Sequence, residues 1–99
     1  MSKPRNKPSL DTKHIPIKLA LINCGYHVWD CGIYGRGMPD LLVMSKAKQS
    51  QFVFLEVKSP KGKLRDTQVD FFEMFACAPV YIVRSAEEAL AAMGIEDVR

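Results

Sequence analysis

The chain has 99 residues, of which 47% are hydrophobic and 25% are charged, and its formal net charge is +3. This length suits one domain with a modest core rather than two domains. No apolar run approaches the roughly 18 residues of a membrane span, and the basic N-terminus lacks the apolar segment of a secretory signal. We therefore expect a protein of the cytoplasm that does not associate with membranes.

The three cysteines and the distribution of charge narrow the functional class further. Cys24, Cys31 and Cys77 form no C-x-x-C pair, which argues against a disulfide framework or a zinc cluster. Residues 1–65 hold twelve of the basic and four of the acidic residues, whereas residues 66–99 hold two and seven. A basic N-terminal two-thirds suits a phosphate-binding face, but a solvated lysine-rich surface explains it equally well.

The first part of the chain predicts a helix and a strand after a flexible basic arm at residues 1–11. From residue 12 to about residue 24 the apolar residues recur at helical spacing, and Gly25 supplies the stop. Residues 26–31 are typical of a strand, and residues 32–39 form a loop with three glycines. We expect a single folded domain over residues 12–99.

The second part predicts a strand hairpin, a crossover helix, another strand and a last helix. Residues 40–44 and 51–58 alternate as two strands around a polar turn. A loop at 59–64, a helix at about 65–77 and a strand at 80–84 follow. Ser85 and Glu88 suggest a capping box that opens the last helix, with Gly94 as its end.

This order of elements predicts an α/β domain. A strand–helix–strand crossover places its two strands in parallel, whereas the preceding hairpin is antiparallel. The sheet should therefore be mixed and should carry helices on both faces.

The hairpin brings charged side chains to one strand end. Asp40 begins its strand, while Glu56 and Lys58 end theirs, and in an antiparallel hairpin these positions lie side by side. Alternation puts Glu56 and Lys58 on one face and Val53, Leu55 and Val57 on the other. Two carboxylates and one ammonium are thus expected to converge.

Such a group can perform phosphodiester chemistry. Carboxylates of Asp40 and Glu56 suit Mg²⁺ or Mn²⁺, and the backbone carbonyl of Val57 could be a further ligand. A bound ion activates water, while Lys58 could orient that water or stabilise charge on the phosphate. The structural alternative is an ordinary surface Asp–Lys pair on a hairpin.

Gln68 interrupts the apolar stripe of the following helix. It lies four residues after Leu64, so it faces the same side and needs a hydrogen-bond partner there. Because this helix follows closely on Lys58, we expect Gln68 to face the carboxylates. The alternative is a partly exposed position at the edge of the stripe.

Two loops beside the charged strand end could contact nucleic-acid phosphates. Gly35 and Gly37 would let the backbone approach a phosphate, with Arg36 as a bidentate partner. Lys61, Lys63 and Arg65 form a second basic cluster after Lys58. A solvated loop is the favoured interpretation for either loop alone, but the two loops together beside Asp40 and Glu56 favour phosphate contact.

Several motifs resemble those of the VRR-NUC family of the PD-(D/E)XK nuclease superfamily, in particular its small stand-alone phage and bacterial members. They are "GRGMPDLLV", "FLEVKSPKGKLRDTQVDFF" and "PVYIVRSAEEAL", and the resemblance covers roughly residues 12–94. It implies a restriction-endonuclease-like α-β-β-β-α-β core, in agreement with the order of elements above. It also implies a bacterial cell or a phage-infected host as the setting.

The resemblance implies roles for individual residues. Asp40 and Glu56 would be metal ligands, Lys58 the catalytic lysine and Gln68 the motif glutamine, with Mg²⁺ or Mn²⁺ and no organic cofactor. Many relatives add a glutamate from the first helix. Here that region reads "DTKHIPIK", which leaves Asp11 or His14 for the role, so the number of metal ions stays open.

The expected function is metal-dependent DNA endonuclease activity. Stand-alone relatives are similar to junction resolvases, which favours branched DNA and a homodimer whose apolar contact would include Trp29, Ile33 and Tyr34. The alternatives are a non-catalytic DNA-binding module on the same fold, or a nuclease for nicked or flapped DNA or RNA.

Overall fold

Four strands form one mixed sheet in the order β1-β2-β3-β4. The computed structural model describes residues 14–35, 37–48, 51–75 and 78–99. The strands are β1 (Val28–Asp30), β2 (Leu41–Met44), β3 (Phe52–Val57) and β4 (Val80–Val83). β2 pairs antiparallel with both β1 and β3, and β4 pairs parallel with β3. The predicted hairpin and mixed sheet are therefore confirmed.

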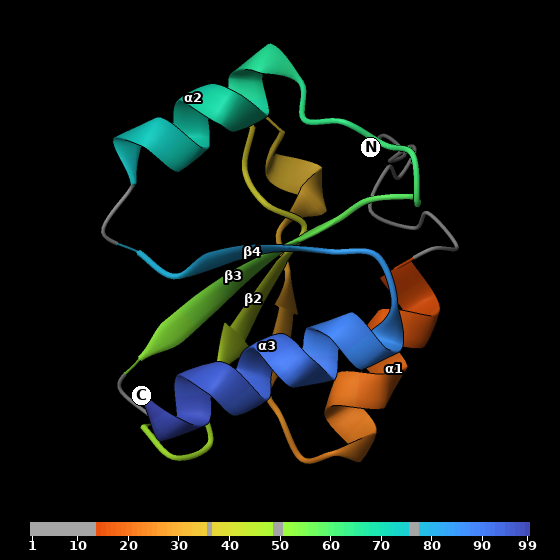
Figure 1. Cartoon of the computed structure of the whole chain (residues 1–99), viewed down its shortest axis with the longest axis vertical. Helices are drawn as coiled ribbons and strands as arrows, with labels where there is room; N and C mark the ends of the chain where they lie inside the picture. Colours follow the sequence, from red (N-terminus) through yellow and green to blue (C-terminus); the bar gives the residue numbers. More distant parts are fainter. Residues whose placement is uncertain (1–13, 36, 49–50, 76–77) are drawn as a thin grey trace, which may run out of the picture.

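The helices cover both faces of this sheet, as predicted (Figure 1). Helices α1 (His14–Asn23) and α3 (Ala86–Val98) lie on one face, and α2 (Asp66–Met74) lies on the other. A short 3-10 helix, η2 (Gly32–Tyr34), occupies the start of the predicted glycine loop. Residues 12, 13, 76 and 77, at the predicted ends of two helices, lie outside the described part of the chain. Within that part, no helix has the length and apolarity to cross a membrane.

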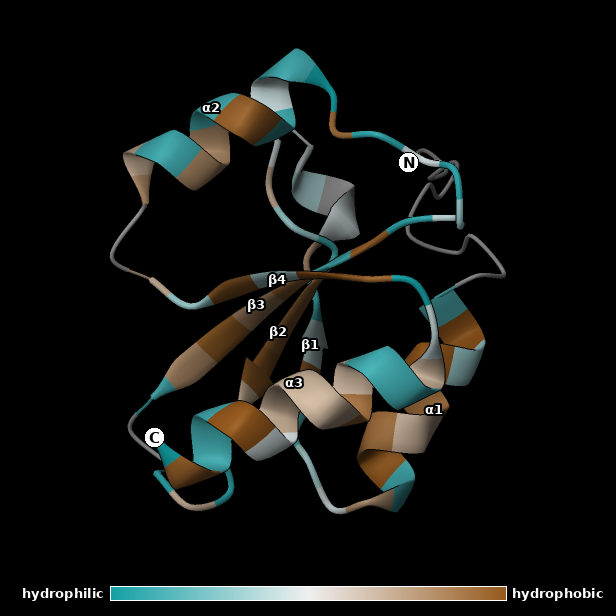
Figure 2. Ribbon diagram, viewed as in Figure 1, coloured by the Kyte–Doolittle hydropathy of each residue, from teal (hydrophilic) through white to brown (hydrophobic). Residues whose placement is uncertain are grey.

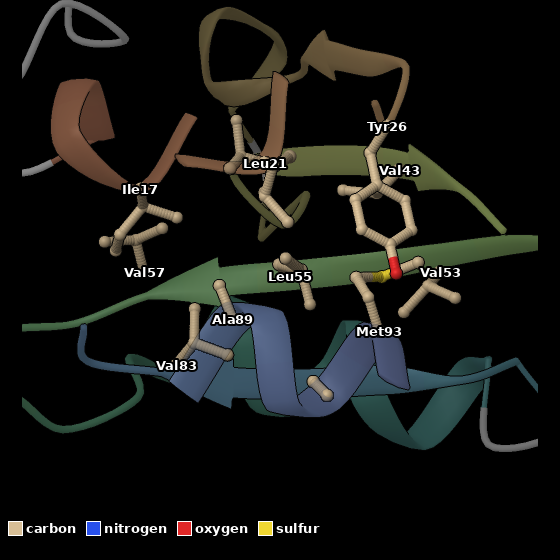
Figure 3. Packing of buried hydrophobic residues seen from close by; sticks show 12 residues of the cluster. Ile17, Leu21, Tyr26, Val43, Val53, Leu55, Val57, Val83, Ala89 and Met93 are labelled. Carbon is tan, nitrogen blue, oxygen red and sulfur yellow. The ribbon is translucent and has the colours of Figure 1, made fainter. Parts of the chain in front are cut away.

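The core lies between the sheet and the α1–α3 layer. Strand alternation sends Val53, Leu55 and Val57 of β3 to this side. They pack there among side chains from both helices and the other strands (Figure 3). Leu21 of α1 and Met93 of α3 are fully buried in the same cluster, so the two helices and the sheet form a single core.

The opposite face of the sheet is only partly covered. Phe54 of β3 packs edge-on against Phe71 of α2, with ring centroids 5.5 Å apart. The strands are mostly hydrophobic along their length (Figure 2), and alternate residues point to opposite faces. On this face Trp29 of β1 and Phe52 of β3 are exposed. This face therefore combines apolar packing under α2 with open apolar surface.

The last helix is longer than the sequence predicts. It continues through Gly94 to Val98, so the prediction that Gly94 ends it is wrong. A glycine within a helix lowers helix stability by only about 1 kcal/mol relative to alanine. The final turn beyond Gly94 is stabilised by the hydrogen bonds of Asp97. Ser85 caps the helix by accepting a hydrogen bond from the Glu88 N–H, but Glu88 Oε1 accepts from the Arg84 N–H at 2.7 Å instead of completing the reciprocal box.

Asp97, in the final turn of α3, connects this helix to the β2–β3 connection through hydrogen bonds. Its carboxylate accepts hydrogen bonds from Ser45 Oγ and Tyr26 Oη, both at 2.6 Å, and from the Lys46 N–H at 3.0 Å. Burial acts to raise the pKa of Asp97, but these hydrogen bonds outweigh it and hold the pKa below its ordinary value. The contact links positions more than 50 residues apart in the sequence.

Replacing Asp97 with alanine should lower the free energy of unfolding by about 2 to 3 kcal/mol, because hydrogen bonds to a charged group are lost together. Urea denaturation at pH 7 measures this as a lower midpoint with an unchanged slope. Asp70→Ala, at an exposed aspartate of α2, is the matched control and should change stability little. Equal midpoints for the two variants would contradict the structural role of Asp97.

Candidate active site

The register of the hairpin places Asp40 beside Glu56. Leu41 pairs with Leu55, so the antiparallel ladder continued by one residue sets Asp40 opposite Glu56. The carbonyl oxygen of Asp40 accepts the Cys31 N–H at 2.7 Å, and its Oδ2 accepts the Val57 N–H at 2.7 Å. Both the backbone and the side chain of Asp40 are therefore held at this end of the sheet.

Glu56 and Lys58 complete the predicted trio. Glu56 lies on the α2 side of β3 and is almost fully buried, with 1% of its surface exposed. Lys58 Nζ lies 3.4 Å from Glu56 Oε2. The structure therefore brings Asp40, Glu56 and Lys58 together, as the alternation and register predicted.

Gln68 connects Glu56 and Lys58 through both ends of its side-chain amide. Its Nε2 donates to Glu56 Oε2 at 2.6 Å, and its Oε1 accepts from Lys58 Nζ at 2.8 Å. The same oxygen accepts the Arg65 N–H at 2.8 Å, at the start of α2. Gln68 is buried, so the reading of an exposed stripe edge is wrong and its predicted orientation toward the carboxylates is confirmed.

These residues line a polar cleft of about 400 Å³. Asp40, Glu56, Lys58 and Gln68 share its wall with His14 and Arg65. His14, in the first turn of α1, is buried, and its Nε2 lies 3.4 Å from Asp40 Oδ1. Of the two first-helix candidates, His14 thus reaches the site, while Asp11 lies outside the described residues.

The donor set suits a hard divalent cation. Glu56 Oε1 is buried and has no hydrogen-bond partner among the described residues, although a buried carboxylate oxygen normally has one. Burial, and then the charge of Asp40, raise the pKa of Glu56 to about 7. A nearby cation would offset both effects. In the described part of the chain no three His, Cys, Asp or Glu side chains form a ready-made metal cluster, so water would complete the coordination.

A comparison with protein families finds a match to the VRR-NUC domain over residues 12–87. The chain belongs to the VRR-NUC family. This is a nuclease family, and the α-β-β-β-α-β-α order around the mixed sheet agrees with its restriction-endonuclease-like fold. Searches among curated proteins and among solved structures gave no match.

The glycine loop of this VRR-NUC domain serves α2 as well as the cleft. Gly37 has a φ of +83°, and a Cβ there would lie 2.0 Å from the Thr67 carbonyl oxygen. Its missing side chain is therefore required by the first turn of α2, which carries Gln68. The approach of this loop to a phosphate stays a prediction. Gly35 has open space around it, and Arg36 lies outside the described residues.

The second basic loop is only partly directed into the cleft. Arg65 lines it, whereas Lys61 and Lys63 are exposed on the loop beside it. Sequence reasoning missed the role of Arg84, whose Nη2 donates to the Gly62 carbonyl oxygen at 2.9 Å. Arg84 thereby ties this loop to the end of β4, a contact between distant segments that no local pattern indicates.

The pKa of Glu56 predicts how metal-free stability varies with pH. Because the folded-state pKa lies above the ordinary value of 4.5, the stabilising contribution of the protonated form is complete below about pH 4.5 and is lost as the pH rises through about 7. Because a glutamine amide does not ionise, Glu56→Gln should abolish this loss of stability at high pH. In EDTA, this variant should melt about 5 °C above the wild type at pH 8.5, corresponding to about 1 kcal/mol, and close to it at pH 5.

Differential scanning calorimetry at the two pH values provides the measurement. Glu73→Gln, at an exposed position of α2, is the matched control and should follow the wild type at both. A Glu56→Gln variant that melts below the wild type at pH 8.5 would show that burial does not penalise the ionised carboxylate.

Proposed function

We propose that this VRR-NUC protein is a Mg²⁺- or Mn²⁺-dependent endonuclease that hydrolyses DNA phosphodiester bonds. The observation that carries the proposal is the convergence, at one end of a hairpin, of Asp40 with a buried oxygen of Glu56 that has no hydrogen-bond partner among the described residues. A buried carboxylate with a raised pKa is unfavourable for folding alone. It is favourable where a cation binds.

Each residue has a distinct task in this proposal. Asp40, Glu56 and the backbone carbonyl of Val57 would hold the ion, which when bound supplies an activated water and offsets phosphate charge. Lys58 would stabilise charge on the reacting phosphate, because Gln68 keeps its ammonium at the cleft. Gln68 would be a positioning residue, since its amide is occupied by Glu56, Lys58 and Arg65.

The basic surface beside the cleft supports a nucleic-acid substrate. Lys61 and Lys63 are exposed, and Arg65 reaches the cleft from the start of α2. Together with Arg36, these side chains would bind phosphates on either side of the scissile bond, which positions a strand without reading its sequence. Affinity for DNA should therefore fall steeply with salt.

The open sheet face supports assembly as a homodimer. Trp29 is 64% exposed, Tyr34 is 58% exposed and Phe52 is 46% exposed. Trp29 and Phe52 border an apolar hollow of about 240 Å³ with Leu42 and Met44, and the side chain of Ile33 lies outside the described residues. One site cuts one strand, so a dimer would supply the two cuts that a four-way DNA junction requires.

Two alternatives remain as outcomes of the tests. A non-catalytic DNA-binding module would bind DNA but not cut it. It would not need a buried Glu56 oxygen that lacks a partner in the described part of the chain. A nuclease for nicked or flapped DNA or for RNA would use the same cleft, because phosphate contacts do not distinguish these substrates.

Asp40→Ala should abolish cleavage while leaving DNA binding within about twofold of the wild type. The loss of a metal ligand removes water activation, which is worth several orders of magnitude in rate. Labelled four-way junction, splayed-arm and linear duplex DNA would be incubated with each protein in Mg²⁺, Mn²⁺ or EDTA, and cleavage and gel-shift binding would be quantified. Asp70→Ala is the matched control.

Cleavage of the junction by the wild type with metal, and its absence with Asp40→Ala, would support the proposal. Cleavage of only the splayed-arm or the linear duplex DNA would support the proposed metal-dependent hydrolysis but show that a four-way junction is not the preferred substrate. Binding without cleavage under every metal condition would favour the binding module.

Trp29→Glu should convert the dimer into a monomer, because a charge cannot be buried in an apolar contact without large cost. Sedimentation equilibrium should give twice the 11.1 kDa chain mass for the wild type and once that mass for the variant. Leu19→Glu, at a 52%-exposed apolar position of α1, is the control and should stay dimeric. A monomeric wild type at micromolar concentration would refute the dimer.

A further inference from the structure

An apolar groove of about 450 Å³ lies next to the polar cleft, between η2 and α2 (Figure 1). Tyr34 and Met38 line it from η2 and the glycine loop, and Phe71, Met74 and Phe75 line it from the α2 segment. The apolar hollow of the open sheet face is lined by other residues. The groove is therefore a separate feature of the surface.

Large apolar side chains of this groove are exposed to solvent. Met74 is 76% exposed, Tyr34 is 58% exposed and Phe75 is 45% exposed. The rings of Phe71 and Phe75 have centroids 4.6 Å apart, so aromatic surface forms much of the α2 side. Contiguous exposed apolar side chains on a soluble protein mark a place where a ligand or a partner binds.

The groove and the cleft are formed by the same two segments of the chain. Gly32 lines the cleft and Tyr34 lines the groove, and both belong to η2. On the α2 side, Gln68 lines the cleft and the adjacent Thr67 lines the groove. Consecutive Cα atoms are about 3.8 Å apart, and stacked nucleotides of one strand rise about 3.4 Å each. A strand whose phosphate occupies the cleft would therefore pass the groove within about one or two nucleotides.

The charges around the groove suit a nucleobase better than a phosphate. Of the described residues that line the groove, Asp70 alone is charged, and its carboxylate repels phosphate. Residues 66–75 hold three acidic residues and no basic ones, whereas Lys61, Lys63 and Arg65 lie just before them. A DNA strand would keep its phosphates at the basic loop and turn its bases toward the groove.

We propose that the groove binds an unpaired base of the DNA strand in the cleft, with stacking on Tyr34 and contacts to Met74 and Phe75. The inference rests on the proposed function and narrows its substrate class to DNA with unpaired bases beside the cleavage site. Every base has a π-face, so stacking on an aromatic side chain requires no particular sequence. A paired base must first leave its duplex, which costs free energy, whereas branch points and single-stranded arms supply bases without that cost.

A second copy of the chain is the competing occupant of the groove. The cores of interfaces between proteins are depleted in charged residues. Asp70 lines the groove, whereas no carboxylate of the described residues lines the hollow at Trp29. The hollow is therefore the better surface for a copy of the chain, and the groove is the better surface for a base.

Fluorescence anisotropy of labelled splayed-arm DNA tests the proposal in EDTA, where the proposed metal-dependent cleavage does not occur. At one unpaired position each DNA carries either an intact nucleotide or an abasic site, and this position is moved stepwise away from the branch. Both forms have the same phosphates, so their electrostatic attraction to the protein is equal. At the position that meets the groove, the intact form should bind about tenfold more tightly, as expected for one stacked base.

Substitutions in the groove assign this difference to its side chains. Tyr34→Ala should remove most of the difference, whereas Tyr34→Phe keeps the ring and should retain it. Met74→Ala should reduce the difference in part. Leu19→Ala, at an exposed apolar position of α1 outside the groove, is the matched control and should behave as the wild type. Circular dichroism would establish that each variant is folded.

Equal affinity for the intact and abasic forms at every position would overturn the inference, and DNA cleavage by the same protein with Mg²⁺ or Mn²⁺ would leave the proposed function standing. A difference that persists in both Tyr34→Ala and Met74→Ala would also overturn it. So would a Tyr34→Ala variant that sediments as a monomer beside a dimeric wild type while still distinguishing the two DNA forms, because the groove would then be a contact between copies. A difference that Tyr34→Ala removes, in a protein that cuts DNA with neither metal, would support the groove and refute the nuclease.

Discussion

The site depends on the side-chain amide of Gln68, which bridges the buried carboxylate of Glu56 and the partly buried ammonium of Lys58. An amide has a donor end and an acceptor end, so it can face Glu56 with its nitrogen and Lys58 with its oxygen. Because the same oxygen also accepts the Arg65 N–H, the start of α2 is fixed by the groups that it serves. Disruption of this interaction would deprive the buried carboxylate of Glu56 of its hydrogen-bond donor.

Several features of the fold bring Gln68 into place. Phe54 and Phe71 pack α2 against β3 on the side away from the main core. Gly37 permits the first turn of α2 to approach the loop before β2 closely enough that a side chain there would collide with Thr67. The glycine loop, the hairpin and α2 are therefore coupled, and Asp40, Glu56 and Gln68 are set by one packing arrangement.

The two ends of the sheet handle polar groups in opposite ways. At the β2–β3 connection, Asp97 is surrounded by donors from Ser45, Tyr26 and the backbone, which stabilises its ionised form. At the other end, Glu56 keeps a buried oxygen without a partner among the described residues. The hydrogen bonds of Asp97 stabilise the fold at the β2–β3 connection. At the other end, burial of the Glu56 carboxylate is unfavourable, and a bound cation would offset that cost. This contrast is expected where function opposes stability.

The sequence by itself determined the order of elements and the convergence of Asp40, Glu56 and Lys58 at the hairpin end, because both follow from local periodicity. Alternation gives β3 a core side and a side that carries Glu56, and hairpin pairing sets Asp40 opposite Glu56. It also indicated that Gln68 would face them. Only tertiary packing decided that His14 reaches Asp40, that Gly37 serves α2, and that Asp97 extends α3 beyond Gly94. These contacts join segments far apart in the chain. Which residues meet in these contacts depends on how the helices pack against the sheet, and the residue spacing within a single segment does not specify this packing.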